Sequence, residues 1–215
     1  MIFDGHSDIF SDVRYKREAG ETQVLKNHHL DRLRKGGIGG ACFVIWADTY
    51  NGHAPKDEME AIVKGIKGEM AETKEFVLIH NVEELKAAEA AGKFAILLGI
   101  EGLAGIGEDL SKIDELYDLG ARHAMLTWNE ENALATGVKG DPNRGVTDLG
   151  KQAIKKLQEK KMILDVSHIN EKSFWDVIDL ATGPILASHS NAKALASAAR
   201  NLTDDQLRAI RDTNG

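Results

Sequence analysis

Seven apolar segments constrain the fold of this chain more than any other feature of its sequence. They lie at residues 2–9, 41–47, 76–80, 94–101, 123–128, 162–168 and 184–190. Several are apolar at successive positions and do not alternate with polar residues, which is typical of strands buried on both faces of a parallel sheet. Helix-like segments separate them and begin at capping residues such as Asn81, Thr147, Asn170 and Thr203. Repeated strand–helix units of this kind predict right-handed crossovers and an α/β fold with a parallel sheet.

Charge and cysteine content narrow the class of protein. The 215 residues carry a net charge of −7, and a mildly acidic chain is a poor electrostatic match for nucleic acid. Cys42 is the only cysteine, so no intrachain disulfide can form. No apolar run approaches the roughly 18–20 residues that cross a bilayer, and the first residues carry Asp4, His6 and Asp8 where a signal peptide would be apolar. We therefore expect a cytoplasmic protein with no membrane or nucleic-acid partner.

Residue types that bind metals stand at the ends of four of the apolar segments. His6 and Asp8 stand in "DGHSD", Glu101 ends "GIE", His168 ends "DVSH" and His189 stands in "SHS". His6 and Asp8 are two positions apart, so both would point to the same face of a strand. The carboxyl ends of parallel strands open onto one face, where the active sites of α/β proteins lie. Imidazoles and carboxylates are the usual ligands of zinc, and five of them favour two ions bridged by a carboxylate.

Each of these residues also has an ordinary structural interpretation. A single histidine after a strand is more often a hydrogen-bonded polar residue than a ligand, and Glu101 has the option of capping a helix after Gly102. His123 begins an apolar segment and does not end one, so we expect no ligand role for it. The coincidence of five potential ligands at strand ends makes a metal site the favoured interpretation.

Four motifs, "DGHSD", "GIEG", "DVSH" and "SHSN…RN", resemble the membrane dipeptidase (renal dipeptidase) family, zinc peptidases of the amidohydrolase superfamily. The resemblance runs from residue 4 to the last residue, and it implies a (β/α)8 TIM-type barrel with two zinc ions. It implies these metal ligands: His6 and Asp8 for one ion, His168 and His189 for the other, and Glu101 as the catalytic bridge. It also implies that Arg200 binds the C-terminal carboxylate of the substrate, a role that suits a planar guanidinium.

The sequence departs from the family pattern in two places. Trp128 stands where the best-studied members have a histidine that contacts the reacting amide. Asn129 or Asn132 is a candidate to supply a hydrogen bond to the substrate there, and the alternative is that Trp128 forms a wall of the substrate pocket.

The second departure concerns the end of the barrel. The family carries an aspartate near the end of its eighth strand that handles the proton of the catalytic water. By our count the sequence ends at Gly215 just after the sixth helix of that barrel, without the seventh and eighth strands. Because a barrel cannot close with six strands, we expect residues 1–215 to be a single hydrolase domain without the last two βα units. Such a chain would be part of a longer protein, bind metal, and turn over more slowly than the longer form. A short protein with an open sheet is the alternative.

The resemblance implies hydrolysis of dipeptides, including L-Xaa-D-Xaa dipeptides, by water that two metals activate, in a homodimer. This chemistry requires no nucleophilic serine or cysteine, and the sequence has no Gly-x-Ser-x-Gly motif. Two alternatives stay open. Another metal-dependent amidohydrolase, acting on a cyclic amide or lactone, would not need Arg200 as a carboxylate clamp. A non-catalytic metal-binding protein is the other, and Trp128 and the missing aspartate slightly favour it.

Overall fold

The computed structural model describes residues 1–47 and 52–215. The strands within them are β1 (Ile2–Ser7), β2 (Ile38–Trp46), β3 (Phe76–Leu78), β4 (Phe94–Glu101), β5 (His123–Met125), β6 (Ile163–Asp165) and β7 (Ile185–Leu186). The α-helices are α1 (Ile9–Glu18), α2 (Asp31–Lys35), α3 (Pro55–Glu72), α4 (Val82–Ala90), α5 (Lys112–Leu119), α6 (Asp148–Glu159), α7 (Glu171–Leu180) and α8 (Asp204–Asp212). A π-helical segment lies at Leu25–Leu30 and a 3-10 turn at Ala104–Ile106. Two compact units divide the chain: residues 1–100 with 120–122, and residues 101–119 with 123–215.

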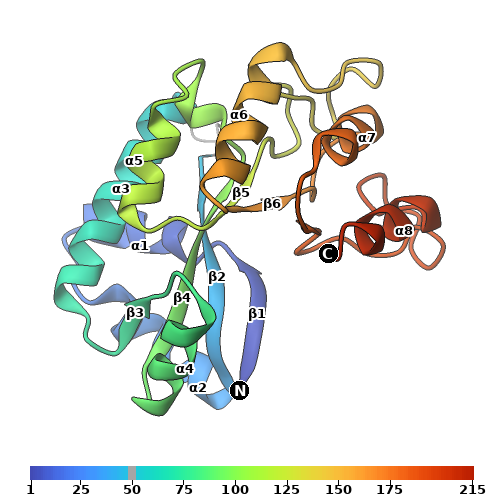
Figure 1. Cartoon of the computed structure of the whole chain (residues 1–215). Helices are drawn as coiled ribbons and strands as arrows, with labels where there is room; N and C mark the ends of the chain where they lie inside the picture. Colours follow the sequence, from blue (N-terminus) through green and yellow to red (C-terminus); the bar gives the residue numbers. More distant parts are fainter. Residues whose placement is uncertain (48–51) are drawn as a thin grey trace. The chain divides into compact units, whose positions relative to one another are not determined.

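The first unit is built on a parallel four-stranded sheet in the order β1-β2-β4-β3. Helices α1 and α3 pack against each other and against β2, beside the sheet (Figure 1). Phe43 of β2 is fully buried, and its ring contacts those of Phe10 and Phe94, each with centroids 5.5 Å apart. Aromatic pairs at such distances add to the free energy gained by burying their apolar surface. The consecutive apolar residues of β2 are therefore buried because both faces of this strand are covered.

The described residues contain seven strands, whereas the sequence comparison with the barrel predicts six, and β3 accounts for the difference. It pairs in parallel with β4, from Phe76 opposite Phe94 to Leu78 opposite Ile96, at the outer edge of the sheet. Without β3, the strands follow one another in chain order within their sheets: β1, β2, β4 in the first unit and β5, β6, β7 in the second. The expectation of an α/β fold with parallel strands is confirmed.

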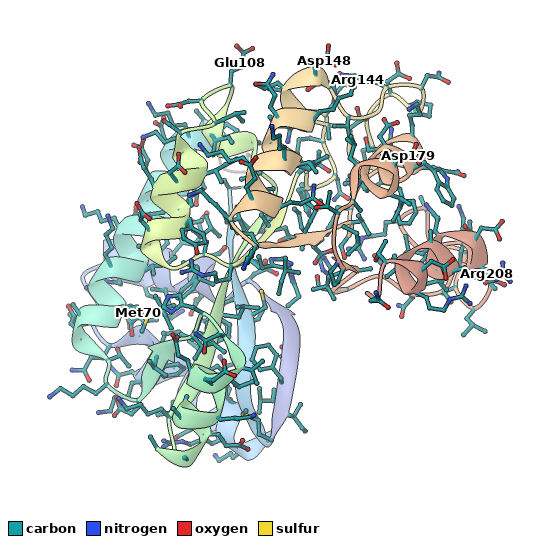
Figure 2. The ribbon with its side chains drawn as sticks, in the orientation of Figure 1. Met70, Glu108, Arg144, Asp148, Asp179 and Arg208 are labelled. Atoms are coloured by element: carbon teal, nitrogen blue, oxygen red, sulfur yellow. The ribbon has the colours of Figure 1, made fainter. Side chains whose placement is uncertain are left out.

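The second unit contains the parallel sheet β5-β6-β7 and helices α5 to α8. The predicted caps are present: Thr147 and Asn170 accept from backbone N–H groups at the starts of α6 and α7, and Thr203 forms a capping box with Gln206 at the start of α8. Such caps each contribute about 0.5–2 kcal/mol to helix stability. The polar faces of these helices point outward, as the side chains of Asp148, Asp179 and Arg208 show (Figure 2).

The strands of the second unit are shorter than their apolar segments. Strand β6 ends at Asp165 and β7 at Leu186, so His168 and His189 each lie three residues beyond a strand, in a loop. His168 has φ +71°, a left-handed conformation that no strand residue adopts. Asp8 likewise follows β1 and is the N-cap residue of α1. The prediction that these residues end strands is therefore wrong in detail, because the loops after the strands carry them.

Within the described ranges, no helix combines the length and the apolar character that a membrane crossing requires.

Candidate metal centre

Three of the predicted ligands meet in the second unit. The Nε2 atoms of His168 and His189 are 2.7 Å apart, and Oε1 of Glu101 lies 3.0 Å from the first and 3.4 Å from the second. Ligand atoms around a tetrahedral zinc, with bonds of about 2.0–2.1 Å, lie about 3.3 Å from one another. The spacing of these three atoms is close to that of a zinc ligand set.

Hydrogen bonds on the far side of each ring fix which nitrogen faces this point. Nδ1 of His168 lies 2.9 Å from the amide oxygen of Asn129, and Nδ1 of His189 lies 2.9 Å from Oγ of Ser188. An Nδ1–H that donates to an oxygen leaves the lone pair on Nε2, and this arrangement is usual for metal-binding histidines. With both rings in this tautomer, two imidazole nitrogens and a carboxylate oxygen converge as acceptors, a donor set that fits a divalent cation.

Glu101 is the last residue of β4, and its side chain is buried. Helix capping does not account for it, because the following 3-10 turn has Leu103 as its N-cap and no side-chain cap bond. Gly102 turns the chain immediately after Glu101 with φ +81°, where a Cβ atom would lie 2.7 Å from the backbone nitrogen of Trp128. Only glycine tolerates both this φ and this close approach.

The other two predicted ligands lie in the first unit. His6 belongs to β1, and its Nε2 atom is 3.6 Å from Oδ1 of Asp8. The ring is 9% exposed and the carboxylate 51% exposed. The two side chains are therefore neighbours, as their spacing suggests, although Asp8 lies outside the strand. Their role as ligands stays a prediction.

Arg200 lies against both histidines of the second unit. Its Nη1 donates to the backbone carbonyl of His189 at 2.6 Å, and its Nη2 donates to Nε2 of His168 at 2.9 Å. Burial lowers the pKa of the guanidinium, while the charges of Glu101 and Asp165 oppose this effect. The Nε atom of Arg200 is buried and has no hydrogen-bond acceptor. This donor is suited to an anionic group of a ligand.

The remaining predicted site residues differ in what they contact. The ring of Trp128 lies 6.0 Å from that of His168, between centroids, and Lys139 Nζ lies 5.7 Å from the centroid of Trp128. The amide oxygen of Asn129 is engaged by His168. Asn132 donates to the carbonyl of Leu126 and accepts from backbone N–H groups at 134 and 135, so its side chain shapes its own loop.

Sequence reasoning missed a buried pair behind the two histidines. The side chains of His123 and Asp165 are both 0% exposed, with Nε2 and Oδ2 2.8 Å apart. Burial alone would raise the pKa of Asp165, but the hydrogen bond and charge of His123, with hydrogen bonds from Ser188 and Ser167, lower it to about 2. Asp165 is the first residue of the motif "DVSH", and its place three residues before His168 is the sequence feature from which a role for it could have been predicted.

Acid should weaken the second unit through Asp165. A carboxyl with a lowered pKa stabilises the fold above its unfolded value of about 3.9, and this contribution is lost as pH falls towards the folded value. At about 1.4 kcal/mol per pK unit, the loss for Asp165 is about 2 kcal/mol. The gap in unfolding free energy between the metal-free chain and its Asp165→Asn variant should therefore narrow by that amount from about pH 5 to about pH 2. Urea unfolding at a series of pH values measures the gap, and a constant gap would contradict the prediction.

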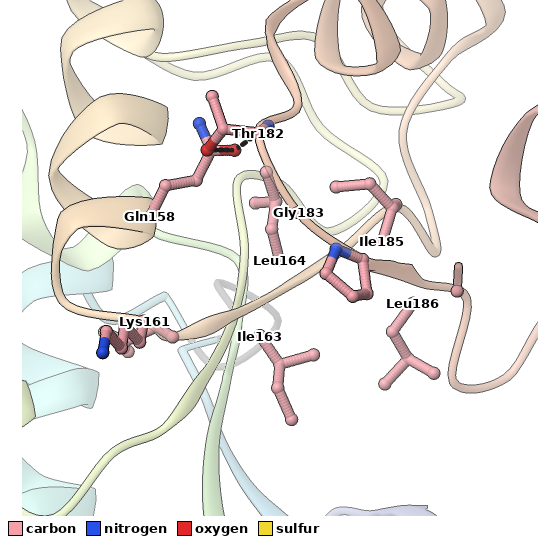
Figure 3. Close-up of a pocket in the computed structure, with 11 residues that line it drawn as sticks. Gln158, Lys161, Ile163, Leu164, Thr182, Gly183, Ile185 and Leu186 are labelled. Carbon is pink, nitrogen blue, oxygen red and sulfur yellow. Dashed lines mark hydrogen bonds between the residues drawn. The ribbon is translucent and has the colours of Figure 1, made fainter. Parts of the chain in front are cut away.

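A cavity of about 470 Å³ opens elsewhere in the second unit. Residues at the start of β6 and β7 line it, including Ile163, Leu164 and Ile185, together with Gln158 of α6 and Thr182, which hydrogen-bond each other (Figure 3). None of the predicted ligands lines it. The cavity is at the amino ends of these strands, whereas His168 and His189 follow their carboxyl ends, so its size does not make it the candidate site.

Comparison with known proteins relates the whole chain to one family. The model of the membrane dipeptidase family (peptidase family M19) matches residues 1–215. An uncharacterized protein in the PQQ-III 3' region of Acinetobacter calcoaceticus is 31% identical over 245 residues, which cover 100% of this chain and 78% of that protein. An uncharacterized protein in the pqqA 5' region of Klebsiella pneumoniae is 43% identical over 141 residues, or 63% of this chain and 51% of that protein.

Solved structures agree with this relationship. A metallo peptidase from Rhodobacter sphaeroides, liganded with a phosphinate mimic of the dipeptide L-Ala-D-Ala, matches with a TM-score of 0.88 at 26% identity, over 100% of this chain and 72% of its own. Dipeptidase AC, a metallo peptidase of family M19, matches with a TM-score of 0.89 at 26% identity, over 100% of this chain and 71% of its own. These relatives have a TIM-barrel-like fold, as expected for this chain. The chain belongs to the membrane dipeptidase family, the metal-dependent dipeptidases of peptidase family M19.

Proposed function

We propose that this protein hydrolyses dipeptides with a free C-terminal carboxylate, L-Xaa-D-Xaa dipeptides among them, at a centre of two zinc ions. The observation that carries the proposal is the cluster of Glu101, His168 and His189, in which the two Nε2 atoms and a carboxylate oxygen lie within 3.4 Å of one another. Glu101 would be the ligand shared by the two ions, the two histidines would hold one of them, and His6 and Asp8 would hold the other. The Rhodobacter sphaeroides relative, liganded with its L-Ala-D-Ala mimic, supports the substrate class.

The chain's own residues prepare the site for this chemistry. Divalent ions held at this site would lower the pKa of a bound water and polarise the carbonyl of the scissile amide. Asn129 and Ser188 hold the imidazoles of His168 and His189 with their Nε2 lone pairs towards the centre. The indole of Trp128 lies beside His168 and forms an apolar wall against the bound dipeptide.

Arg200 recognises the substrate's C-terminal carboxylate. Nη2 of Arg200 donates to Nε2 of His168, the atom that would bind the metal, so this donor would be available to a substrate when the metal is bound. This nitrogen and the buried Nε atom belong to one planar guanidinium, which binds a carboxylate through two parallel hydrogen bonds. A dipeptide with a free C-terminus supplies that carboxylate, whereas a lactone or cyclic amide does not.

Replacing Arg200 should therefore remove the preference for a free C-terminus. Hydrogen bonds to charged groups contribute about 1.5–3 kcal/mol, so Arg200→Leu should lower kcat/KM for a dipeptide about 10- to 100-fold. Hydrolysis of the same dipeptide with an amidated C-terminus should change little, because that substrate offers no carboxylate. The measurement is the ratio of kcat/KM for the two substrates in the parent chain and the variant, and an unchanged ratio would assign Arg200 another role.

Metal analysis combined with a substrate panel tests the proposed function. Two zinc ions per chain and hydrolysis of L,D-dipeptides are the expected results, and light scattering should give the mass of a homodimer. Hydrolysis of lactones or cyclic amides, with no action on dipeptides, would point to another amidohydrolase activity. Stoichiometric metal without turnover of any substrate would point to a metal-binding protein.

A further inference from the structure

Asp165 connects the two loops that carry His168 and His189. Its Oδ1 atom accepts a hydrogen bond from the backbone nitrogen of Ser167 at 2.7 Å, and the backbone nitrogen of Ser188 lies 3.3 Å from Oδ2 and 3.4 Å from Oδ1. Each of these serines directly precedes one of the histidines. One buried carboxylate therefore fixes the backbone immediately before two predicted ligands that are 21 residues apart in the chain.

His123 holds this carboxylate from the opposite side. Its Nε2 atom lies 2.8 Å from Oδ2 of Asp165, and both side chains are excluded from solvent. A buried carboxylate without partners would be costly, and three donors from three different elements satisfy this one. His123 comes from β5, Ser167 from the loop after β6 and Ser188 from the loop after β7. The carboxylate is thus at the junction of all three strands of the sheet.

The loop before His168 needs such support. His168 adopts φ +71°, a conformation that costs free energy for a residue with a Cβ atom and persists where neighbouring contacts fix it. Besides Asp165, the backbone nitrogen of Val138 donates to the carbonyl of His168 at 2.8 Å. A second bond ties the loops to each other, because Oγ of Ser167 accepts from the backbone nitrogen of His189 at 3.3 Å.

We infer that Asp165 is a positioning residue for the metal centre: its buried carboxylate, held by His123, sets the separation and direction of the His168 and His189 imidazoles. It touches neither the metal nor the substrate. This inference rests on the proposed function, since it assumes that both histidines bind the metal. If the inference is right, changes to His123 or Asp165 alter metal binding, whereas changes to a buried ion pair elsewhere in the chain do not.

Metal titration of Asp165→Asn tests the inference directly. The amide retains the size of the carboxylate but has no charge and only one acceptor oxygen, so its hydrogen bonds to the two serine nitrogens and to His123 should be weaker and differently arranged. Outer partners of metal ligands typically affect metal affinity by about 10- to 100-fold. We expect Co²⁺ to bind this variant more weakly by that factor, with a changed visible absorption spectrum, because the spectrum reports the geometry of the ligands.

Variants of His123 provide a second test of the inference in case Asp165→Asn does not fold. His123→Gln places an amide N–H where Nε2 was, so it should retain Co²⁺ affinity within a few-fold. His123→Leu removes the donor and should lose affinity about as much as Asp165→Asn. Equal affinities and equal spectra in the Gln and Leu variants would overturn the inference.

Glu69→Gln in the first unit is the matched control for burial and charge. The Glu69 carboxylate is also 0% exposed, pairs with Arg17, and accepts from the backbone nitrogen of Leu25 at 2.8 Å. This variant should lower the melting temperature without changing Co²⁺ affinity or the spectrum. If Asp165→Asn behaves in the same way, Asp165 is merely structural and the inference fails. If the parent chain itself binds no Co²⁺, the proposed function fails, and this outcome is distinct from failure of the variants.

Discussion

Removal of metal with a chelator should abolish dipeptide hydrolysis, and the return of Zn²⁺ should restore it. The sequence has no Gly-x-Ser-x-Gly motif and its one cysteine, Cys42, is buried, so we expect hydrolysis to depend on a water activated by metal. The melting temperature should fall together with the activity. A ligand that binds only the folded state stabilises it by about 2.7 kcal/mol at a concentration of 100 times its Kd.

The measurement pairs a rate assay with calorimetry on samples of known metal content. Mg²⁺ added back serves as a control, because it prefers oxygen ligands and an octahedral geometry and should not replace zinc at two imidazoles. Persistent hydrolysis by a chain shown to contain no metal would contradict the proposed function.

Glu101→Gln should have the largest effect of any single substitution. The amide has the size of the carboxylate but carries no charge, and the charge is what allows one side chain to hold two cations. We expect the variant to lose one or both zinc ions. Its activity should fall by a larger factor than the loss of about 10- to 100-fold that follows mutation of residues that only support the ligands. Metal stoichiometry by mass spectrometry and the rate on an L,D-dipeptide are the two measurements.

Glu69→Gln is again the appropriate comparison, because it is an identical chemical change at an equally buried site. It should retain full metal content. Unchanged stoichiometry in Glu101→Gln would show that the carboxylate does not bridge, whatever the other ligands do.

Local patterns in the sequence predicted most of the fold. The consecutive apolar residues of β2 and β4 indicated strands buried on both faces, and Thr147, Asn170 and Thr203 cap helices as their positions suggested. Such signals depend on neighbouring residues only, so a single sequence contains them. The place of β3 at the edge of its sheet was not predictable in this way, because strand order depends on pairing across the fold.

The candidate site was predictable to the extent that its residues follow strands. Glu101, His168 and His189 come together because parallel strands deliver their carboxyl ends to one side. The pair of His123 and Asp165 was not predictable, because it depends on the register of β5 against β6, where Met125 lies opposite Asp165. The contact between Asn129 and His168 depends on the path of a loop, which no periodic pattern encodes.

Gly102 has a consequence for how relatives of this chain can diverge. A larger residue there would meet the backbone nitrogen of Trp128 at 2.7 Å and the carbonyl carbon of Thr127 at 3.2 Å, and backbone atoms cannot rotate away as a side chain can. A substitution of Gly102 therefore requires a change in the backbone conformation at residues 127–128. A relative with another residue in place of Gly102 must also have a different backbone path at 127–128, and with it a different position of the residue that corresponds to Trp128. The second glycine of "GIEG" is thus required by the proximity of two backbones, and its loss in a distant relative would be an early sign of a changed loop beside the candidate site.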